Sequence, residues 1–249
     1  MKNQNNNLIE EKAMQNWFNI LKPVLSIPSV IVDRKKFLIK ELTPYCNKKI
    51  IDDAITTTPK NAGISKSTVD KIANGVIKYH NTLVTLISFA AGIPGGIWMI
   101  GTIPADLAQY YFHILQVVQK LAYIYGWPDF FKEKIEMDDE SLYLITLFIG
   151  VMTGTKKANN ALKIISEKLA KEVAERLPRL PLTKYIVYKA AKQVAKWLGQ
   201  KLTKQTFGIF VAKAIPILSA LTSGILTFAT FKSQCIRLKN HLSELPLAC

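Results

Sequence analysis

The chain has 249 residues and is 49% apolar, so it can bury a sizeable core as one large domain or two small ones. Its 33 Lys and Arg against 18 Asp and Glu give a net charge of +15, which favours an anionic partner: nucleic acid, a phospholipid surface or an acidic protein. The three scattered cysteines, Cys46, Cys235 and Cys249, form no CxxC pair, which excludes a disulfide framework and a zinc site.

Residues 1–65 are predicted to form an N-terminal helical region behind a disordered leader. The leader is the polar stretch "MKNQNNN", and helical spacing of apolar residues begins at Leu8. No apolar core of a secretory signal occurs in residues 1–17, so we expect a cytoplasmic protein. Residues 66–249 are predicted to form a helical core whose C-terminal part is basic.

The first long apolar segment is residues 83–105, which contain no charge and could span a bilayer by length alone. It follows a helical pattern for which Ser67 or Thr68 is the expected N-cap. Glycines near its middle, together with Pro94, would interrupt a straight span. We therefore predict a broken or re-entrant apolar helix pair, or a tightly packed core hairpin.

The next helix is predicted from Pro104, a residue suited to a first helical turn, to Gly126, a typical C-terminal stop. One face of this helix is polar, because four residues follow at i, i+3, i+4 and i+7. The carboxylate on this face can be interpreted in two ways. It is either a charge that stabilises the helix start, or part of a polar ligand-binding face that includes an acid/base pair. The residues of this face are Asp106, Gln109, Tyr110 and His113.

The second half of the chain continues the helical pattern without a convincing strand. The predicted segments are an apolar helix at 142–154, a Lys/Glu helix at 156–177, a break at 177–183, a helix at 184–202, a second Gly/Pro-marked apolar segment at 207–231 and a short basic tail helix at 232–242. Small residues let helix backbones approach closely, so the two apolar segments are expected to pack together. The predicted fold is all-α, a single compact multi-helix bundle.

The C-terminal part carries only positive charge, since twelve cations and no acid lie between Glu175 and Glu244. At 100° per residue three of the lysines cluster on one side of a helix and apolar residues occupy the other. Such a helix is typical of a membrane-surface or partner-binding element, although a solvated bundle surface, an acidic protein and nucleic acid are alternatives. The candidate anion-binding residues are Lys184, Lys189, Lys192, Lys196, Trp197, Lys201 and Lys204.

Four motifs in order resemble the EcsC family over roughly residues 70–235. They are "AAGIPGG", "IPADLAQYYFHILQVVQKLAYIYGW", "MDDESLYLITLFIGVMTG" and "AKAIPILSALTSGI". The family is named for a protein encoded beside the components of an ABC transporter. The resemblance implies an all-helical bacterial protein associated with transport or the cell envelope, and it transfers no catalytic residues.

Together these patterns favour a non-enzymatic protein that binds anionic phospholipid, and an ABC transporter or another membrane protein as a partner, at the inner face of the cell membrane. The alternatives are a ligand-binding or hydrolase-like protein with a pocket around Asp106–His113, and a cytosolic interaction module. We expect no specific nucleic acid, because no helix-turn-helix, RNP-type or zinc-knuckle motif occurs. No P-loop, Rossmann or GxSxG pattern and no metal-binding HExxH occurs either, so no cofactor, metal or catalytic residue is expected.

Overall fold

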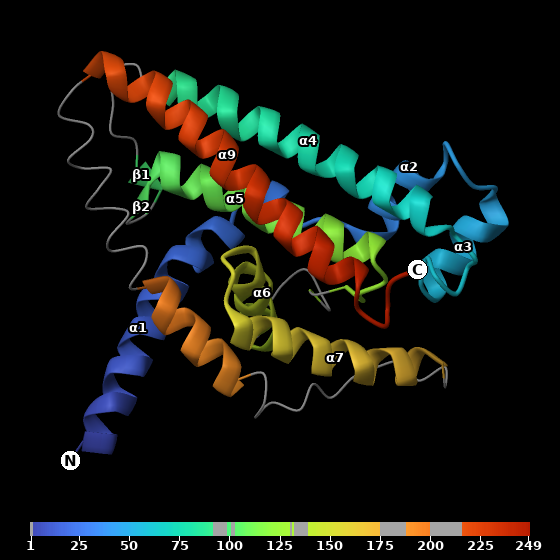
Figure 1. The fold of residues 1–249 in the computed structure, drawn as a ribbon, viewed down its shortest axis with the longest axis horizontal. Coiled ribbons are helices and arrows are strands. Elements are labelled where there is room, and N and C mark those ends of the chain that lie inside the picture. The colour runs from blue at the N-terminus through green and yellow to red at the C-terminus, as the bar shows by residue number, and fades with distance from the viewer. Residues whose placement is uncertain are drawn as a thin grey trace.

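The computed structural model describes residues 2–91, 99–100, 103–129, 131, 139–174, 188–199 and 216–249. These residues are helical apart from loops and one pair of two-residue strands, which confirms the predicted all-α fold (Figure 1). The elements are α1 (Lys2–Leu25), a 3-10 turn (Pro28–Val30), α2 (Arg34–Leu42), α3 (Lys48–Thr56), α4 (Lys66–Ala91), β1 (Met99–Ile100), β2 (Ile103–Pro104), α5 (Ala105–Ile124), α6 (Asp139–Met152), α7 (Lys156–Ala174), a helix at 188–199 and α9 (Pro216–Ser243).

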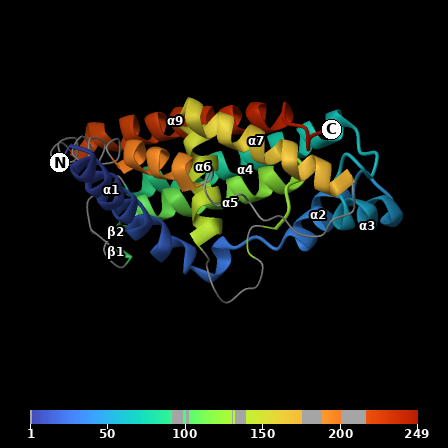
Figure 2. The same ribbon diagram turned by 90° about the horizontal axis from the view of Figure 1, so that it is seen from below.

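Helices α4, α5 and α9 form the centre of the bundle. Helix α4 is antiparallel to both α5 and α9, and all three pack on one another (Figure 1). Helix α6 packs against α5, α7 and α9 and is seen nearly end-on in this view. Figure 2, the view from below, shows α7 in front of α4 and α5. The bundle is therefore built around α5, which contacts α1, α2, α4, α6 and α9.

One continuous core joins the N-terminal helices to the rest of the bundle. Trp17 of α1 is fully buried, and its indole Nε1 donates to Thr146 Oγ1 of α6 at 2.9 Å. Its ring also meets Tyr111 of α5 edge-on, with the ring centroids 5.4 Å apart. Helix α1 begins at Lys2, within the stretch predicted as a disordered leader. Side chains on both sides of the predicted boundary at residue 65 thus share one core.

Short polar residues and glycine set the helix ends. Asp33 accepts from the Lys36 amide at the start of α2, and Asn47 accepts from the Ile50 amide at the start of α3. The cap of α4 is Ser65, whose hydroxyl accepts from the Thr68 amide, so the predicted cap at Ser67 or Thr68 is wrong by two or three residues. Gly126 follows α5 with φ +91°, a conformation that glycine adopts without strain, as its predicted role as a helix stop requires.

The first apolar segment is divided between elements. Its beginning lies in α4, which continues to Ala91, and its end forms the strand pair β1·β2 directly before α5. Pro104 is the last strand residue, so α5 begins one residue later than predicted. Residues 92–98 and 101–102 lie outside the described part. Among the described helices, none is long and apolar enough to cross a membrane.

Residues 216–231 of the second apolar segment and the predicted basic tail helix form one helix, because α9 runs from Pro216 to Ser243 without a break, and residues 207–215 lie outside the described part. The prediction of a separate tail helix at 232–242 is therefore wrong. The physical reason is a buried stripe that crosses the junction at i, i+4, i+7 and i+11. The stripe consists of Phe231, Cys235, Leu238 and Leu242.

Candidate functional site

A chain of three titratable side chains links the interface of α4 and α5 to the surface. His80 of α4 and His113 of α5 are both buried, and their Nδ1 atoms lie 3.0 Å apart. The Nε2 atom on the other side of the His80 ring lies 2.8 Å from Nζ of Lys120, which is half-buried. Because His113 and Lys120 are seven residues apart on α5, both project toward the same side of the helix, where α4 packs.

The hydrogen-bond direction along this chain follows from what each atom has to offer. The ammonium group of Lys120 has only N–H donors, so Nε2 of His80 accepts. A neutral His80 ring then carries its proton on Nδ1, which donates to Nδ1 of His113. His113 in turn carries its proton on Nε2. The three side chains form one directional chain from the half-exposed amine into the core.

Burial keeps both imidazoles neutral. It lowers the pKa of His80 to about 2, with smaller contributions from the positive charge of Lys120 and from His113. It also lowers the pKa of His113 to about 4, again helped by Lys120. Both rings are therefore uncharged at neutral pH, as the hydrogen-bond pattern requires.

The amine end of the chain has an unusual environment for a lysine. Burial, together with the smaller effect of the nearby positive charge of Lys40 of α2, lowers the pKa of Lys120 to about 8 against the opposing effect of Glu41. Nζ of Lys120 also lies 5.8 Å from the centre of the Tyr79 ring, a cation–π distance. The Tyr79 side chain is 59% exposed, so this end of the chain reaches the surface.

Tyr79 belongs to an exposed face of α4 that we call the α4 stripe. At 100° per residue its members fall within one sector of the helix. It combines two cations with two large apolar side chains, Tyr79 and Leu86, each 59% exposed. The single acidic residue of α4, Asp70, instead accepts hydrogen bonds from Lys66 Nζ at 2.8 Å and from the Tyr125 hydroxyl at 2.6 Å. The α4 stripe consists of Lys71, Asn74, Gly75, Lys78, Tyr79, Thr82 and Leu86.

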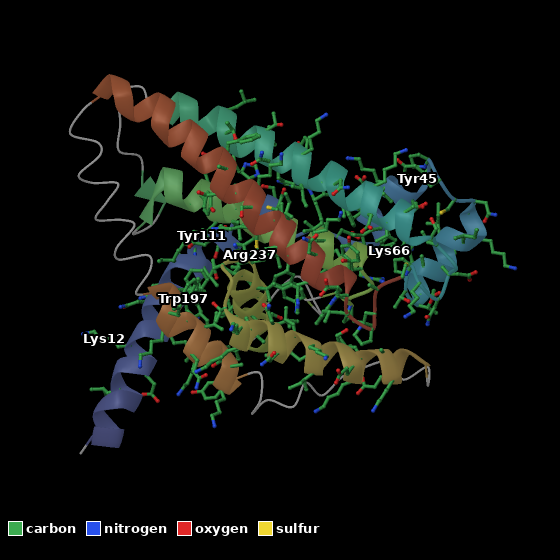
Figure 3. The ribbon with its side chains drawn as sticks, in the orientation of Figure 1. Lys12, Tyr45, Lys66, Tyr111, Trp197 and Arg237 are labelled. Atoms are coloured by element: carbon green, nitrogen blue, oxygen red, sulfur yellow. The ribbon has the colours of Figure 1, made fainter. Side chains whose placement is uncertain are left out.

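The surface continues beside α4 with residues of α2 and the following turn. Tyr45 is 44% exposed, and Nζ of Lys71 lies 5.1 Å above its ring. Figure 3 shows Tyr45 at the end of the bundle where α2 and α3 meet α4. On α2, Ile39 is 40% exposed and its neighbour Lys40 is exposed. Aromatic, aliphatic and cationic side chains thus alternate over this part of the molecule.

The residues predicted as a ligand-binding face of α5 are used largely inside the bundle. The Tyr110 hydroxyl donates to Gln234 Oε1 of α9 at 2.9 Å, and its ring packs edge-on against Phe231. His113 belongs to the chain described above, and Gln109 is half-buried. The side chain of Asp106 lies outside the described residues. The structure therefore separates Tyr110, which faces α9, from His113, which faces His80 of α4.

Three of the predicted anion-binding lysines lie on the helix at 188–199. Lys189 is exposed, and Lys196 and Trp197 are half-buried. Lys192 pairs with Glu11 of α1 at 3.4 Å, lies 4.5 Å from the centre of the Tyr188 ring and is only 17% exposed. Figure 3 shows Trp197 on this helix beside α1. The predicted residues Lys184, Lys201 and Lys204 lie outside the described part of the chain.

Sequence reasoning did not identify His80 or Lys120. The chain has three histidines, and two of them meet in the bundle. A usable signal was present, because His80 falls on the buried face of α4 together with Val76, Ile77 and Val84, where an imidazole needs a partner. Within the described residues, no group of three or more His, Cys, Asp or Glu side chains is placed to hold a metal ion.

Comparison with known proteins does not identify the chain, since no family model, curated protein or solved structure matches it.

Proposed function

We propose that this protein binds peripherally to an anionic phospholipid surface, and that the α4 stripe is the docking face. The observation that carries the proposal is the combination on one helix face of two lysines with exposed Tyr79 and Leu86. Tyrosine favours the headgroup level of a bilayer, where its ring is buried and its hydroxyl stays hydrated.

Charge supports the same partner. The net charge of +15 gives long-range attraction to an anionic leaflet, and each lysine near the surface contributes about 1 kcal/mol. Lys40 of α2 is exposed and close enough to Lys120, beside Tyr79, to lower its pKa, so it extends the positive field of this face. The membrane or transporter partner that the family resemblance implies would be met at the same leaflet.

We prefer the α4 stripe to the predicted basic helix at 188–199 because the lysines of the α4 stripe form fewer contacts within the molecule. Lys192 forms an ion pair with Glu11 and stacks over Tyr188, so moving it to a phosphate would break existing contacts. By contrast, the exposed Lys78 sits between Gly75 and Thr82 on the outer face of α4. Both faces remain testable, since they lie on different helices.

The test is co-sedimentation with phosphatidylcholine vesicles that do or do not contain phosphatidylglycerol. We expect binding only to the anionic vesicles, and its loss at high salt. The variant Lys71→Glu/Lys78→Glu should weaken binding by about a hundredfold or more, because each reversal replaces an attraction with a repulsion. The matched control is Lys156→Glu/Lys157→Glu on α7, which changes the net charge equally on another exposed helix.

The control separates a docking face from diffuse attraction. If both double variants lose binding equally, net charge alone holds the protein and the α4 stripe has no special role. A third variant, Lys189→Glu/Lys196→Glu, tests the predicted basic helix, and its loss of binding with Lys71→Glu/Lys78→Glu unaffected would move the docking face there. Failure of the unaltered protein to bind the anionic vesicles would contradict the proposed function.

A further inference from the structure

The side chains of Lys120, His80 and His113 have the arrangement of an activated nucleophile. A lysine is activated as a nucleophile by burial, and its lone pair must be oriented toward the substrate. Here the amine Nζ lies 2.8 Å from His80 Nε2, and His80 Nδ1 lies 3.0 Å from His113 Nδ1. We propose that Lys120 is a nucleophilic amine that forms a Schiff base with small anionic aldehydes, with His80 as the hydrogen-bond acceptor that orients the amine and His113 as the residue that fixes His80.

Lys120 is better placed to act as a nucleophile than a fully exposed lysine is. Its side chain is half-buried, which favours the neutral amine, yet its tip is close to the exposed Tyr79 ring and so within reach of a small molecule. When one N–H is directed at His80 Nε2, the lone pair of the neutral amine points away from His80 and is free to attack. Burial and the charge of Lys40 lower the pKa of Lys120 to about 8, which enlarges the neutral fraction at physiological pH.

The surroundings also indicate the class of aldehyde. Lys40 and Glu41 of α2, whose Nζ and Oε1 lie 4.0 Å apart, have opposite effects on the pKa of Lys120, and the positive charge of Lys40 has the larger effect. After the amine loses its proton, this excess of positive charge remains and attracts a carboxylate or phosphate on the substrate. The ring of Tyr79, centred 5.8 Å from Nζ, offers a flat surface beside the reacting atom.

The reaction is an ordinary condensation and needs no oxidant or reductant. The lone pair of Nζ forms a bond to the carbonyl carbon, while the carbonyl oxygen takes a proton from water, which becomes hydroxide. The nitrogen then loses one proton to this hydroxide, which restores the water and leaves a neutral carbinolamine. The C=N bond forms as the hydroxyl group leaves as water, carrying with it the remaining proton of the nitrogen. One amine and one aldehyde thus give one imine and one water, and both imidazoles stay neutral throughout.

The experiment uses glyoxylate as the probe, with sodium cyanoborohydride to trap the imine, and measures the rate at each lysine by peptide mass spectrometry. At pH 7.5 we expect Lys120 to react at least about tenfold faster than exposed Lys78. Acetaldehyde, which has no charge, should show a smaller preference for Lys120. Reaction of Lys120 no faster than that of Lys78 would overturn the proposal.

Substitutions separate the roles of the two histidines. His80→Leu, which removes the acceptor that orients the amine, should slow the reaction of Lys120 about tenfold and leave Lys78 unchanged, whereas His241→Leu on α9 should change neither. His113→Leu should also slow Lys120, and His113→Asn should restore the rate, because its side-chain Oδ1 can accept from His80 as Nδ1 does. Equal rates in the Leu and Asn variants would show that His113 does not orient His80.

The pH profile gives a readout that does not depend on a buried substitution. The rate at Lys120 should reach half its maximum near pH 8 in the unaltered protein. Lys40→Gln removes a like charge from the exposed surface and should move this midpoint upward. A rate at Lys120 that rises through pH 10 with the surface lysines would contradict an activated amine.

Discussion

Two buried polar side chains of α5, Gln119 and His113, differ in the kind of group to which they form hydrogen bonds. Gln119 is fully buried and bonds to backbone: its Nε2 donates to the carbonyls of Val30 and Leu115, and its Oε1 accepts from the Val32 amide, each at 2.9 Å. His113 bonds instead to another titratable side chain, which in turn meets a half-exposed amine.

The difference distinguishes a group that holds the fold from one that is available for chemistry. Two hydrogen bonds of Gln119 fix the segment between α1 and α2 against α5, and the third goes to the Leu115 carbonyl within α5, so both N–H donors of the side chain are used by backbone. The His113–His80–Lys120 chain satisfies its inner members and leaves its outer member at the surface. Substitution of Gln119 should therefore change the stability of the fold, whereas substitution of the histidines should change how many protons the chain binds.

The largest expected effect is that of Gln119→Leu. It leaves the Val32 amide and the Val30 carbonyl without their partner in the core, and each such buried group costs about 1–3 kcal/mol. We expect the free energy of unfolding, measured by urea titration, to fall by about 3 kcal/mol. Gln116→Leu is the matched control, because the half-buried Gln116 also donates to this segment, at the Ser29 carbonyl, but in a hydrogen bond that is exposed to solvent. Equal losses in both variants would show that burial does not decide the cost.

The histidine pair should make stability depend on pH. Both pKa values are depressed in the folded protein, to about 2 and about 4, so at pH below about 6.5 the unfolded chain takes up protons that the folded chain does not. The stabilisation is thus present above pH 6.5 and is lost as the pH falls toward 4. Between pH 7 and pH 5.5 we expect a loss of about 2 kcal/mol from the pair.

The measurement is urea unfolding at both pH values for the unaltered chain and for His80→Leu/His113→Leu. The double variant should lose less stability on acidification, because its two sites no longer titrate. Burial also lowers the pKa of His241, which adds to the trend in both proteins, so the difference between them isolates the pair. An identical pH dependence in the two proteins would mean that the pair is not held neutral in the fold.

Local signals in the sequence predicted the helices well and their long-range contacts poorly. Gly126 and Pro104 mark the ends of α5 to within two residues, because backbone conformation at these positions depends on the residue itself. The prediction of a separate tail helix failed at 232, where the change from apolar to basic composition was outweighed by the buried stripe that continues along α9.

The candidate site shows why contacts are harder to predict than elements. His80 and His113 are 33 residues apart, and their contact requires a particular register of α4 on α5 that no local pattern specifies. Helical spacing correctly placed Tyr110 and His113 on neighbouring positions of α5. It could not show that α9 lies beside one of them and α4 beside the other, which divides the predicted polar face.

A smaller effect is expected for Tyr110→Phe, which tests whether this residue serves the fold or a ligand. Its hydroxyl donates to Gln234 at 2.9 Å, and burial raises the pKa of the phenol, so the group stays protonated. Loss of this bond should cost about 1 kcal/mol of unfolding free energy. A double-mutant cycle with Gln234→Ala should show coupling of similar size. No coupling would free Tyr110 for the ligand-binding role that the sequence predicted.

The smallest change in stability is expected for Tyr79→Ala, where the same substitution should have a larger effect on binding. The Tyr79 side chain is 59% exposed, so its removal should change the free energy of unfolding by less than about 0.5 kcal/mol. The affinity of the Tyr79→Ala variant for phosphatidylglycerol vesicles should nevertheless fall several-fold, because the ring is the part of the α4 stripe suited to the headgroup region. Ile164→Ala on α7, an exposed apolar residue of another helix, is the control that should leave affinity unchanged. Equal affinities for the two variants would reduce the α4 stripe to its charges, whereas a loss confined to Tyr79→Ala would show that a residue contributing little to the fold contributes directly to docking.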